Sequence, residues 1–213
     1  CDLASVVIEV GSRVTRFNPG DAVFADIFDQ GTGSIAEFAV VPESATALKP
    51  ANLDFVQAAS IPMVGLTSWQ ALKERIGLRA GQKVFIAAGS GGIGTFAIQL
   101  AKWLGATVGT TTSTGNVDLV RSLGADEVVD YKKQAFETVL RDYDAALGTV
   151  RGDSIKKSIG ILKARGQLVS LVGPLDVAFA RARHTNLVLT AVFALMSFSI
   201  KRLTGGRAVV SGT

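Results

Sequence analysis

Hydrophobic positions follow different spacings in the two parts of the chain. Residues 3–47 hold short apolar runs at 6–10, 22–25 and 35–41, separated by turns rich in glycine, asparagine and proline. Such runs between turn residues predict short strands, as in a piece of a β-barrel. After residue 50 the apolar positions Leu66, Trp69, Leu72 and Ile76 recur every three or four residues, which predicts helix. We therefore expect a domain boundary near residue 48.

Strands and helices alternate from residue 83 onward. Apolar, β-rich segments predict strands at 84–88, 106–111, 127–130, 144–150 and 167–172, and the segments between them predict helices at 93–104, 117–123, 136–140 and 155–162. Successive β-α units require a parallel sheet with right-handed crossovers. The predicted fold class is α/β, a doubly wound Rossmann sheet preceded by part of a β-barrel.

Composition excludes several classes of protein. The 213 residues are 48% hydrophobic and 19% charged with a net charge of +4, which excludes disordered, collagen-like and disulfide-built chains. One cysteine, Cys1, and one histidine, His184, are too few soft and imidazole ligands for zinc, so we expect no metal. Because a single cysteine cannot pair within the chain and no signal peptide is recognisable, we expect a reducing, cytoplasmic location.

Charge is concentrated near the C-terminus. Residues 1–150 carry 12 basic and 16 acidic side chains, whereas residues 151–213 carry 10 and 2. Aromatic residues are not interleaved with these cations, so we expect a solvated face or the wall of an anion site and no nucleic-acid binding. The apolar run 187–200 contains polar residues and is shorter than the ~20 residues that cross a bilayer, so no membrane span is predicted.

A glycine motif carries the strongest chemical signal. Gly89, Gly91 and Gly94 form GxGxxG between a predicted strand and a predicted helix. The first glycine allows a tight turn, the second lets the backbone approach a pyrophosphate, and the third allows close helix packing. The free N–H groups at the helix start would face the phosphates. No Lys-Ser/Thr pair follows, which excludes a P-loop, and the motif predicts dinucleotide binding.

The same turn has a second interpretation. Residues 88–92 also resemble a nucleophile elbow, in which Ser90 would be the nucleophile and Asp153 and His184 its partners. The full glycine pattern satisfies a more demanding backbone requirement and favours the dinucleotide.

The cofactor's identity is predicted from the end of the second strand. An acidic residue there would bind the ribose 2′-hydroxyl of NAD. Residues 109–116 instead read GTTTSTGN, and the first acid is Asp118. Hydroxyl and amide groups can donate hydrogen bonds to a 2′-phosphate without the charge repulsion of a carboxylate, so NADPH is favoured over NADH. The alternative is an ordinary polar loop with a helix cap.

Several segments together resemble a known family. Residues 62–72 (PMVGLTSWQAL), 98–102, 123–131 (LGADEVVDY) and 166–170 are similar to the zinc-independent medium-chain dehydrogenase/reductases, in particular the NADPH quinone oxidoreductase or zeta-crystallin branch. The resemblance implies three parts: 1–48, a partial GroES-like catalytic domain; 49–186, the Rossmann domain; and 187–213, the start of the return to the catalytic domain. We expect an internal fragment of a longer protein.

The resemblance also implies site residues. Thr67 matches a threonine near the nicotinamide, with a helix cap as the alternative. Ser90, Gly91, Gly92, Ile93 and Gly94 match the pyrophosphate turn. Ser113 and Tyr131 match positions near the adenosine 2′-phosphate, with a packed aromatic as the alternative for Tyr131. Leu171, Val172 and Gly173 match a strand end near the nicotinamide, although Val172 would also suit a core. Asn116 stands where several relatives have lysine, and Gly148 and Arg151 depart from the family pattern.

The implied activity is metal-free hydride transfer from NADPH to a quinone, an enone or a related carbonyl compound. A small-molecule electron acceptor is the expected substrate, and the full-length protein is expected to be a homodimer. No catalytic residue is assigned, because part of the barrel is expected to lie outside this sequence. An enoyl reductase, free-standing or of the polyketide-synthase type, and a non-catalytic NADPH-binding protein are the alternatives.

Overall fold

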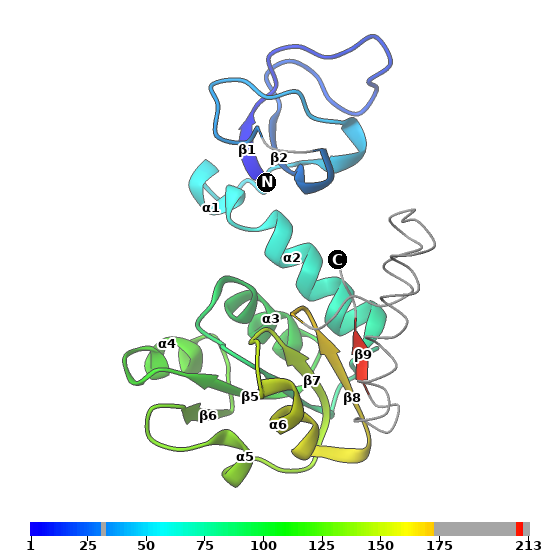
Figure 1. Ribbon diagram of the computed structural model, residues 1–213. Coiled ribbons are helices and arrows are strands. Elements are labelled where there is room, and N and C mark those ends of the chain that lie inside the picture. The colour runs from blue at the N-terminus through cyan, green and yellow to red at the C-terminus, as the bar shows by residue number, and fades with distance from the viewer. Residues whose placement is uncertain (31–32, 173–207, 211–213) are drawn as a thin grey trace. The chain divides into compact units, whose positions relative to one another are not determined.

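The computed structural model describes residues 1–30, 33–172 and 208–210 (Figure 1). The chain forms two compact units, with the division between Leu66 and Thr67.

The N-terminal unit contains a small antiparallel sheet. Strand β1 (Asp2–Val6) pairs with β2 (Ala22–Asp26), which pairs with β3 (Thr46–Leu48). Short 3-10 turns lie at η1 (Phe28–Gln30) and η2 (Glu43–Ala45). The buried core of this sheet is small and consists of Leu3, Ala25 and Ile27, with Val41 packed against it.

The strand predicted at residues 35–41 is not formed. Ile35 is 100% and Val40 99% exposed, and the third strand is β3 instead. The sheet order β1-β2-β3 leaves the outer edges of β1 and β3 open, and residues 35–41 pair with neither of them. The strand predicted at 6–10 is also shifted, because β1 ends at Val6 and the backbone bonds between Val7, Gly20 and Asp21 close the hairpin there.

Two helices and a π-helical segment follow. Helix α1 (Phe55–Ala59) begins with a capping box, in which Asp54 and Gln57 bond each other's backbone N–H groups. Helix α2 (Pro62–Trp69) starts with proline, and Asp2 Oδ1 accepts the N–H of Met63 at 2.9 Å. The π-helical segment η3 (Gln70–Arg75) follows directly.

The predicted apolar stripe does not stay on one helix face. Leu72 is fully buried and Ile76 packs against the core, whereas Leu66 is 52% and Trp69 39% exposed. The i→i+5 spacing of η3 departs from the regular helical period, so positions before and after it do not align.

The C-terminal unit is built on a six-stranded parallel sheet. Its order is β6-β5-β4-β7-β8-β9, with all neighbours parallel. The strands are β4 (Lys83–Ile86), β5 (Thr107–Thr112), β6 (Glu127–Asp130), β7 (Tyr143–Gly148), β8 (Leu162–Ser170) and β9 (Ala208–Val210). The chain starts at the centre with β4, runs out through β5 and β6, and returns on the other side through β7. The predicted doubly wound α/β fold is confirmed.

Helices cover both faces of this sheet (Figure 1). Helices α3 (Gly92–Trp103) and α4 (Val117–Ser122) pack on the face formed by Val84 and Ile86. Helices α5 (Phe136–Val139) and α6 (Ser154–Gly160) pack on the other face, where the rings of Phe85 and Phe136 stack 4.7 Å apart. Because both faces are covered, the central strands are continuous apolar runs.

Helices α3 and α4 start and end within one residue of the bounds predicted from the sequence. Within the described part of the chain, no helix has both the length and the apolar character needed to cross a membrane.

Candidate functional site

The glycine turn lies between β4 and α3, at the carboxyl edge of the sheet. A Cβ at Gly89 would overlap the side chain of Thr110, and a Cβ at Gly94 would overlap the carbonyl oxygen of Ala88. A Cβ at Gly91 would lie 3.3 Å from the same carbonyl oxygen, a tight contact. Glycine at 89 and 94 is therefore required by the close approach of strand and helix.

Strand β5 holds this turn in an unusual conformation. Ala88 has φ +53°, a left-handed value that costs a non-glycine residue about 1–2 kcal/mol. Its N–H donates to Thr111 Oγ1 at 3.1 Å, and the N–H of Gly89 donates to the Thr111 carbonyl at 2.9 Å. These bonds offset the backbone strain, so β5 is part of the turn's support.

The start of α3 has the features of an anion site. Gly91 is the N-cap, with extended backbone, and no side chain caps the helix. The N–H groups of Gly92, Ile93 and Gly94 have no acceptor within the helix, and residues 91 and 92 are exposed. Such an end binds phosphate through its N–H groups and the helix dipole.

A network of neutral polar side chains adjoins the turn. Ser90 Oγ accepts from Thr112 Oγ1 at 2.9 Å and from Asn116 Nδ2 at 3.3 Å, and Asn116 Nδ2 also lies 3.2 Å from Ser113 Oγ. The structure thus brings together three predicted residues, Ser90, Ser113 and Asn116, from the glycine turn and the segment after β5. The hydrogen bonds of this network include no carboxylate.

An acidic group on β6, which was not among the predicted residues, bonds to Thr114 in the segment after β5. Asp130 Oδ2 accepts from Thr114 Oγ1 at 2.7 Å, Asp130 Oδ1 accepts the N–H of Lys132 at 3.0 Å, and Lys133 Nζ lies 3.7 Å from Oδ2. The bond from Thr114, followed by these neighbours, holds the pKa of Asp130 below its ordinary value. The ionised carboxylate is stabilised by these hydrogen bonds and by the ammonium group of Lys133.

Tyr131 follows Asp130 directly. Its N–H donates to the Thr112 carbonyl at 3.1 Å, which places its backbone beside the end of β5. Its side chain is not packed in a core, because the residue is 59% exposed. An exposed ring beside the Ser113 segment is available to a ligand.

The remaining predicted residues lie outside this network. Thr67 is half-buried on α2 and makes no hydrogen bond with the network among the described residues. The N–H of Leu171 donates to the Gly148 carbonyl at 2.9 Å, and the N–H of Val172 lies 3.4 Å from Ser170 Oγ. Leu171 and Val172 therefore continue the carboxyl edge beyond β7 and β8. Gly173 lies outside the described residues.

The two departures from the family pattern cause no packing conflict. A Cβ at Gly148 would meet its nearest atom, Ser170 Oγ, at 3.6 Å, which is an ordinary contact. Arg151 is exposed.

Sequence reasoning missed the threonines that hold the turn. Thr110 Oγ1 donates to the Ile86 carbonyl at 2.6 Å, and Thr149 Oγ1 donates to the Ala87 carbonyl at 2.8 Å, besides the contacts of Thr111 and Thr112 above. Residues 110–112 are between 0% and 7% exposed. Three consecutive threonines at 110–112, at the end of the strand predicted over 106–111, were the available signal, because hydroxyls that become buried need partners.

The nucleophile interpretation of Ser90 receives no support from its neighbours. The two hydrogen-bond partners of its Oγ, Thr112 and Asn116, supply a hydroxyl and an amide, and neither is a base. Asp153 lines a separate pocket near α6, and His184 lies outside the described residues.

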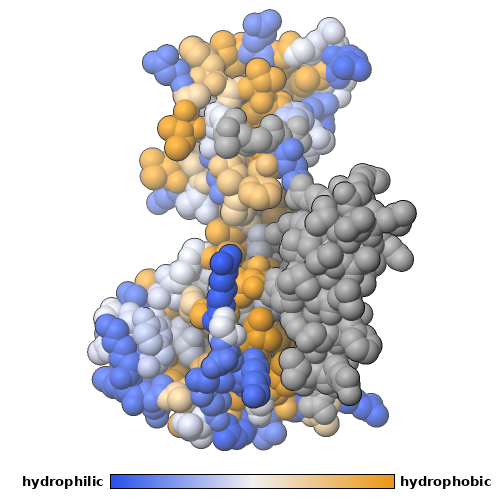
Figure 2. All heavy atoms as spheres, viewed as in Figure 1, coloured by the Kyte–Doolittle hydropathy of each residue, from blue (hydrophilic) through white to orange (hydrophobic). Residues whose placement is uncertain are grey.

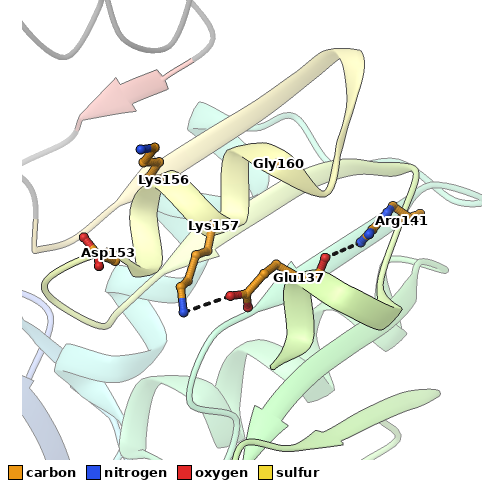
Figure 3. Close-up of a pocket in the computed structure, with 6 residues that line it drawn as sticks. All are labelled: Glu137, Arg141, Asp153, Lys156, Lys157 and Gly160. Carbon is orange, nitrogen blue, oxygen red and sulfur yellow. Dashed lines mark hydrogen bonds and ion pairs between the residues drawn. The ribbon is translucent and has the colours of Figure 1, made fainter. Parts of the chain in front are cut away.

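That pocket lies between α5 and α6 (Figure 3). Its volume is about 440 Å³, and Glu137, Arg141, Asp153, Lys156, Lys157 and Gly160 line it. Lys157 Nζ pairs with Glu137 Oε1 at 2.8 Å, and this bond lowers the pKa of Glu137. These helices cover the sheet face opposite α3, so the pocket is separate from the glycine turn.

The described residues offer no metal site. No group of three or more histidine, cysteine, aspartate or glutamate side chains among them is placed to hold a metal ion.

The comparison with protein families places the chain. Residues 92–209 match the family model of the zinc-binding dehydrogenases, which covers more than half of the sequence. The chain belongs to this family.

Two relatives from plants are named as a reductase and an oxidoreductase. The chain is 39% identical over 181 residues to the 2-methylene-furan-3-one reductase of Solanum lycopersicum and 38% identical over 180 residues to the chloroplastic NADPH-dependent alkenal/one oxidoreductase of Arabidopsis thaliana. Each alignment covers 81% of this chain and 46% of the relative. The chain therefore spans about half the length of these relatives.

A solved structure agrees with the fold. The quinone oxidoreductase from Coxiella burnetii superposes with a TM-score of 0.80 and 31% identity, covering 99% of this chain and 61% of that one. The expected resemblance to the quinone oxidoreductase branch of the medium-chain dehydrogenase/reductases is confirmed.

Proposed function

We propose that this chain is the dinucleotide-binding part of an oxidoreductase that uses NADPH to reduce a quinone, an enone or a related carbonyl compound. The relatives' names support the reaction class, since they include an alkenal/one oxidoreductase and a quinone oxidoreductase. Alkenals, enones and quinones share an electron-poor carbon that accepts hydride.

The observation that carries the cofactor preference is the neutral network of Ser90, Ser113 and Asn116. A carboxylate at this place would bind a ribose 2′-hydroxyl and repel a 2′-phosphate. Hydroxyl and amide groups bind the phosphate without that repulsion, so the network favours NADPH.

The chain's own residues would bind and orient the cofactor. The first N–H groups of α3 would hold the pyrophosphate, and Ser113, Asn116 and Tyr131 would adjoin the adenosine 2′-phosphate. Thr67, Leu171, Val172 and Gly173 would adjoin the nicotinamide. NADPH supplies the hydride when it is bound. Solvent would supply the proton, and no catalytic residue is assigned.

The first test is a parallel titration with NADPH and NADH, followed by fluorescence. We expect tighter binding of NADPH. In Asn116→Asp the new carboxylate should weaken NADPH binding about tenfold or more while leaving NADH binding unchanged or improved. A folded chain, by circular dichroism, that binds neither cofactor would contradict the proposal.

The acceptor is tested with the full-length protein. NADPH oxidation with quinones, enones or aldehydes is the expected result. Turnover restricted to an acyl-thioester enone would instead identify an enoyl reductase, and tight binding without turnover would identify a non-catalytic NADPH-binding protein.

We also propose that the full-length protein is a homodimer, which sedimentation would test. The division into a partial GroES-like domain (1–48), a Rossmann domain (49–186) and a returning segment (187–213) is likewise a proposal. One relative is named as chloroplastic, so a cytoplasmic location stays a prediction that fractionation would test.

A further inference from the structure

Thr112 is buried but reaches the candidate site through its hydroxyl. It is the last residue of β5 and is 1% exposed, so it has almost no surface with which to touch a ligand. Its Oγ1 donates to Ser90 Oγ at 2.9 Å. Any effect of the Thr112 hydroxyl on a ligand would therefore pass through Ser90.

Ser90 receives two hydrogen bonds at one oxygen. A serine hydroxyl has two acceptor lone pairs and one hydrogen. Thr112 Oγ1 and Asn116 Nδ2 both donate to Ser90 Oγ, which fills both lone pairs. The Ser90 hydrogen must then point elsewhere, and Ser90 is half-buried, two residues before the exposed start of α3.

We propose that Thr112 is a positioning residue that fixes the Ser90 hydroxyl as a hydrogen-bond donor toward a phosphate group of the bound dinucleotide. The proposal rests on the proposed function. Phosphate oxygens only accept hydrogen bonds, so a hydroxyl whose lone pairs are already filled suits them, and a bond to the charged group is stronger than a neutral one.

Two phosphate groups of NADPH share this chemistry. One is the pyrophosphate, which both nicotinamide cofactors carry, and the other is the adenosine 2′-phosphate, which NADH lacks. The network includes residues of both the glycine turn and the Ser113 segment, so it lies near the expected place of either phosphate. Comparing NADPH with NADH binding shows which of the two phosphates the Ser90 hydroxyl contacts.

The test compares Thr112→Val with Thr112→Ser in the full chain. Valine keeps the shape and removes the donor, and we expect about fivefold weaker NADPH binding, whereas serine keeps the hydroxyl and should restore the wild-type Kd. Thr107→Val is the matched control, because Thr107 lies at the other end of β5 and its side chain makes no hydrogen bond among the described residues. Thr112→Cys, with a weak donor, is a second variant should valine prevent folding; we expect weakened binding there too.

A double-mutant cycle separates positioning from general stability. Ser90→Ala should weaken binding by itself, and adding Thr112→Val to Ser90→Ala should cause no further loss. If Thr112→Val weakens NADPH and NADH binding equally, the Ser90 hydroxyl contacts the pyrophosphate. If it weakens NADPH binding alone, the hydroxyl contacts the 2′-phosphate. Both outcomes support the proposal.

Two results would overturn it. One is a folded Thr112→Val chain, by its melting temperature, that binds NADPH as tightly as wild type. The other is a loss that persists at full size in the Ser90→Ala background. Either result leaves wild-type NADPH binding intact, whereas failure of the proposed function would appear as a folded wild-type chain that binds neither cofactor.

Discussion

At the residue scale, the glycine motif combines two physical requirements. Gly89 and Gly94 lack side chains because strand and helix approach too closely for a Cβ. Gly91 and Gly92, at the exposed helix start, leave the backbone N–H groups accessible. The motif therefore allows close packing at Gly89 and Gly94 and approach of a ligand to the backbone at Gly91 and Gly92.

A substitution at Gly94 tests the packing requirement. In Gly94→Ala the new methyl group overlaps the Ala88 carbonyl oxygen, so helix and turn must separate. We expect a loss of about 1–3 kcal/mol in the free energy of unfolding and weaker NADPH binding. Urea unfolding and cofactor titration would measure both effects.

The matched control for this substitution is Gly115→Ala. A Cβ at Gly115 meets nothing within 4 Å, so this change should leave the stability within about 0.5 kcal/mol of wild type. Equal losses in the two variants would contradict the packing argument.

At the element scale, the amino edge of the parallel sheet carries a chain of charges opposite the candidate site. Lys83 Nζ pairs with Glu127 Oε1 at 2.8 Å, Tyr143 donates to Glu127 Oε2 at 3.0 Å, and Lys163 Nζ pairs with Asp144 at 2.6 Å. Burial and then Glu127 raise the pKa of Tyr143, so its phenol stays protonated. These contacts join β4, β6, β7 and β8 at their starts.

The Asp144 pair makes stability depend on pH. Burial raises the pKa of Asp144, but Lys163 and the N–H of Lys83 lower it more, so the folded pKa lies below the ordinary 3.8. A depressed pKa contributes stability that is complete above the unfolded value and is lost as pH falls through the folded value. We expect the melting temperature to fall below about pH 4, with a shallower fall in Asp144→Asn. Identical pH slopes would refute this account.

Gly109 tests how closely the strands pack at this edge. A Cβ at Gly109 in β5 would overlap the Tyr143 hydroxyl. Gly109→Ala should therefore cost about 1–3 kcal/mol of stability, and only part of that cost should vanish when Tyr143→Phe removes the hydroxyl, because ring atoms Cζ and Cε1 would still lie 2.7 and 2.9 Å from the new Cβ. Denaturant unfolding of the two single variants and the double variant measures the coupling, and simple additivity would contradict it.

At the scale of the whole molecule, the two units differ in how completely they bury apolar groups. Figure 2 shows hydrophobic residues on the surface of the N-terminal unit. The most exposed large apolar side chains of this unit are Ile35, Val40, Val56 and Phe38, with exposed fractions from 71% to 100%. The buried core of this unit is small, whereas the parallel sheet has a core on each face. Exposed apolar groups of this extent favour association.

We therefore expect this 213-residue chain to self-associate more than the full-length protein. Replacing Ile35 and Val40 with serine should lower the apparent mass in sedimentation at the same concentration. The control is Leu119→Ser, a 45% exposed leucine on α4. Equal sedimentation of chain and full-length protein, or of variant and wild type, would contradict the expectation.

The sequence was most informative where one physical requirement dominates a segment. Two-sided burial produced the apolar runs of the central strands, and the helical period produced α3 and α4 nearly to the residue. The strand predicted at 35–41 was wrong, because an apolar run forms a strand only where it pairs with another strand, and residues 35–41 pair with none of the described strands. Local pattern contains no such pairing information.

The same distinction holds for the candidate site. The glycine spacing by itself determined a tight strand-to-helix turn, since only glycine meets those backbone distances, and the missing acid near residue 112 determined a neutral cradle. Tertiary structure alone decided that Thr111 supports Ala88, that Thr112 and Asn116 converge on Ser90, and that Asp130 lies beside Thr114. Those contacts join different strands and turns, and hydrogen bonds between such segments depend on the register of neighbouring strands, which packing of the whole sheet sets.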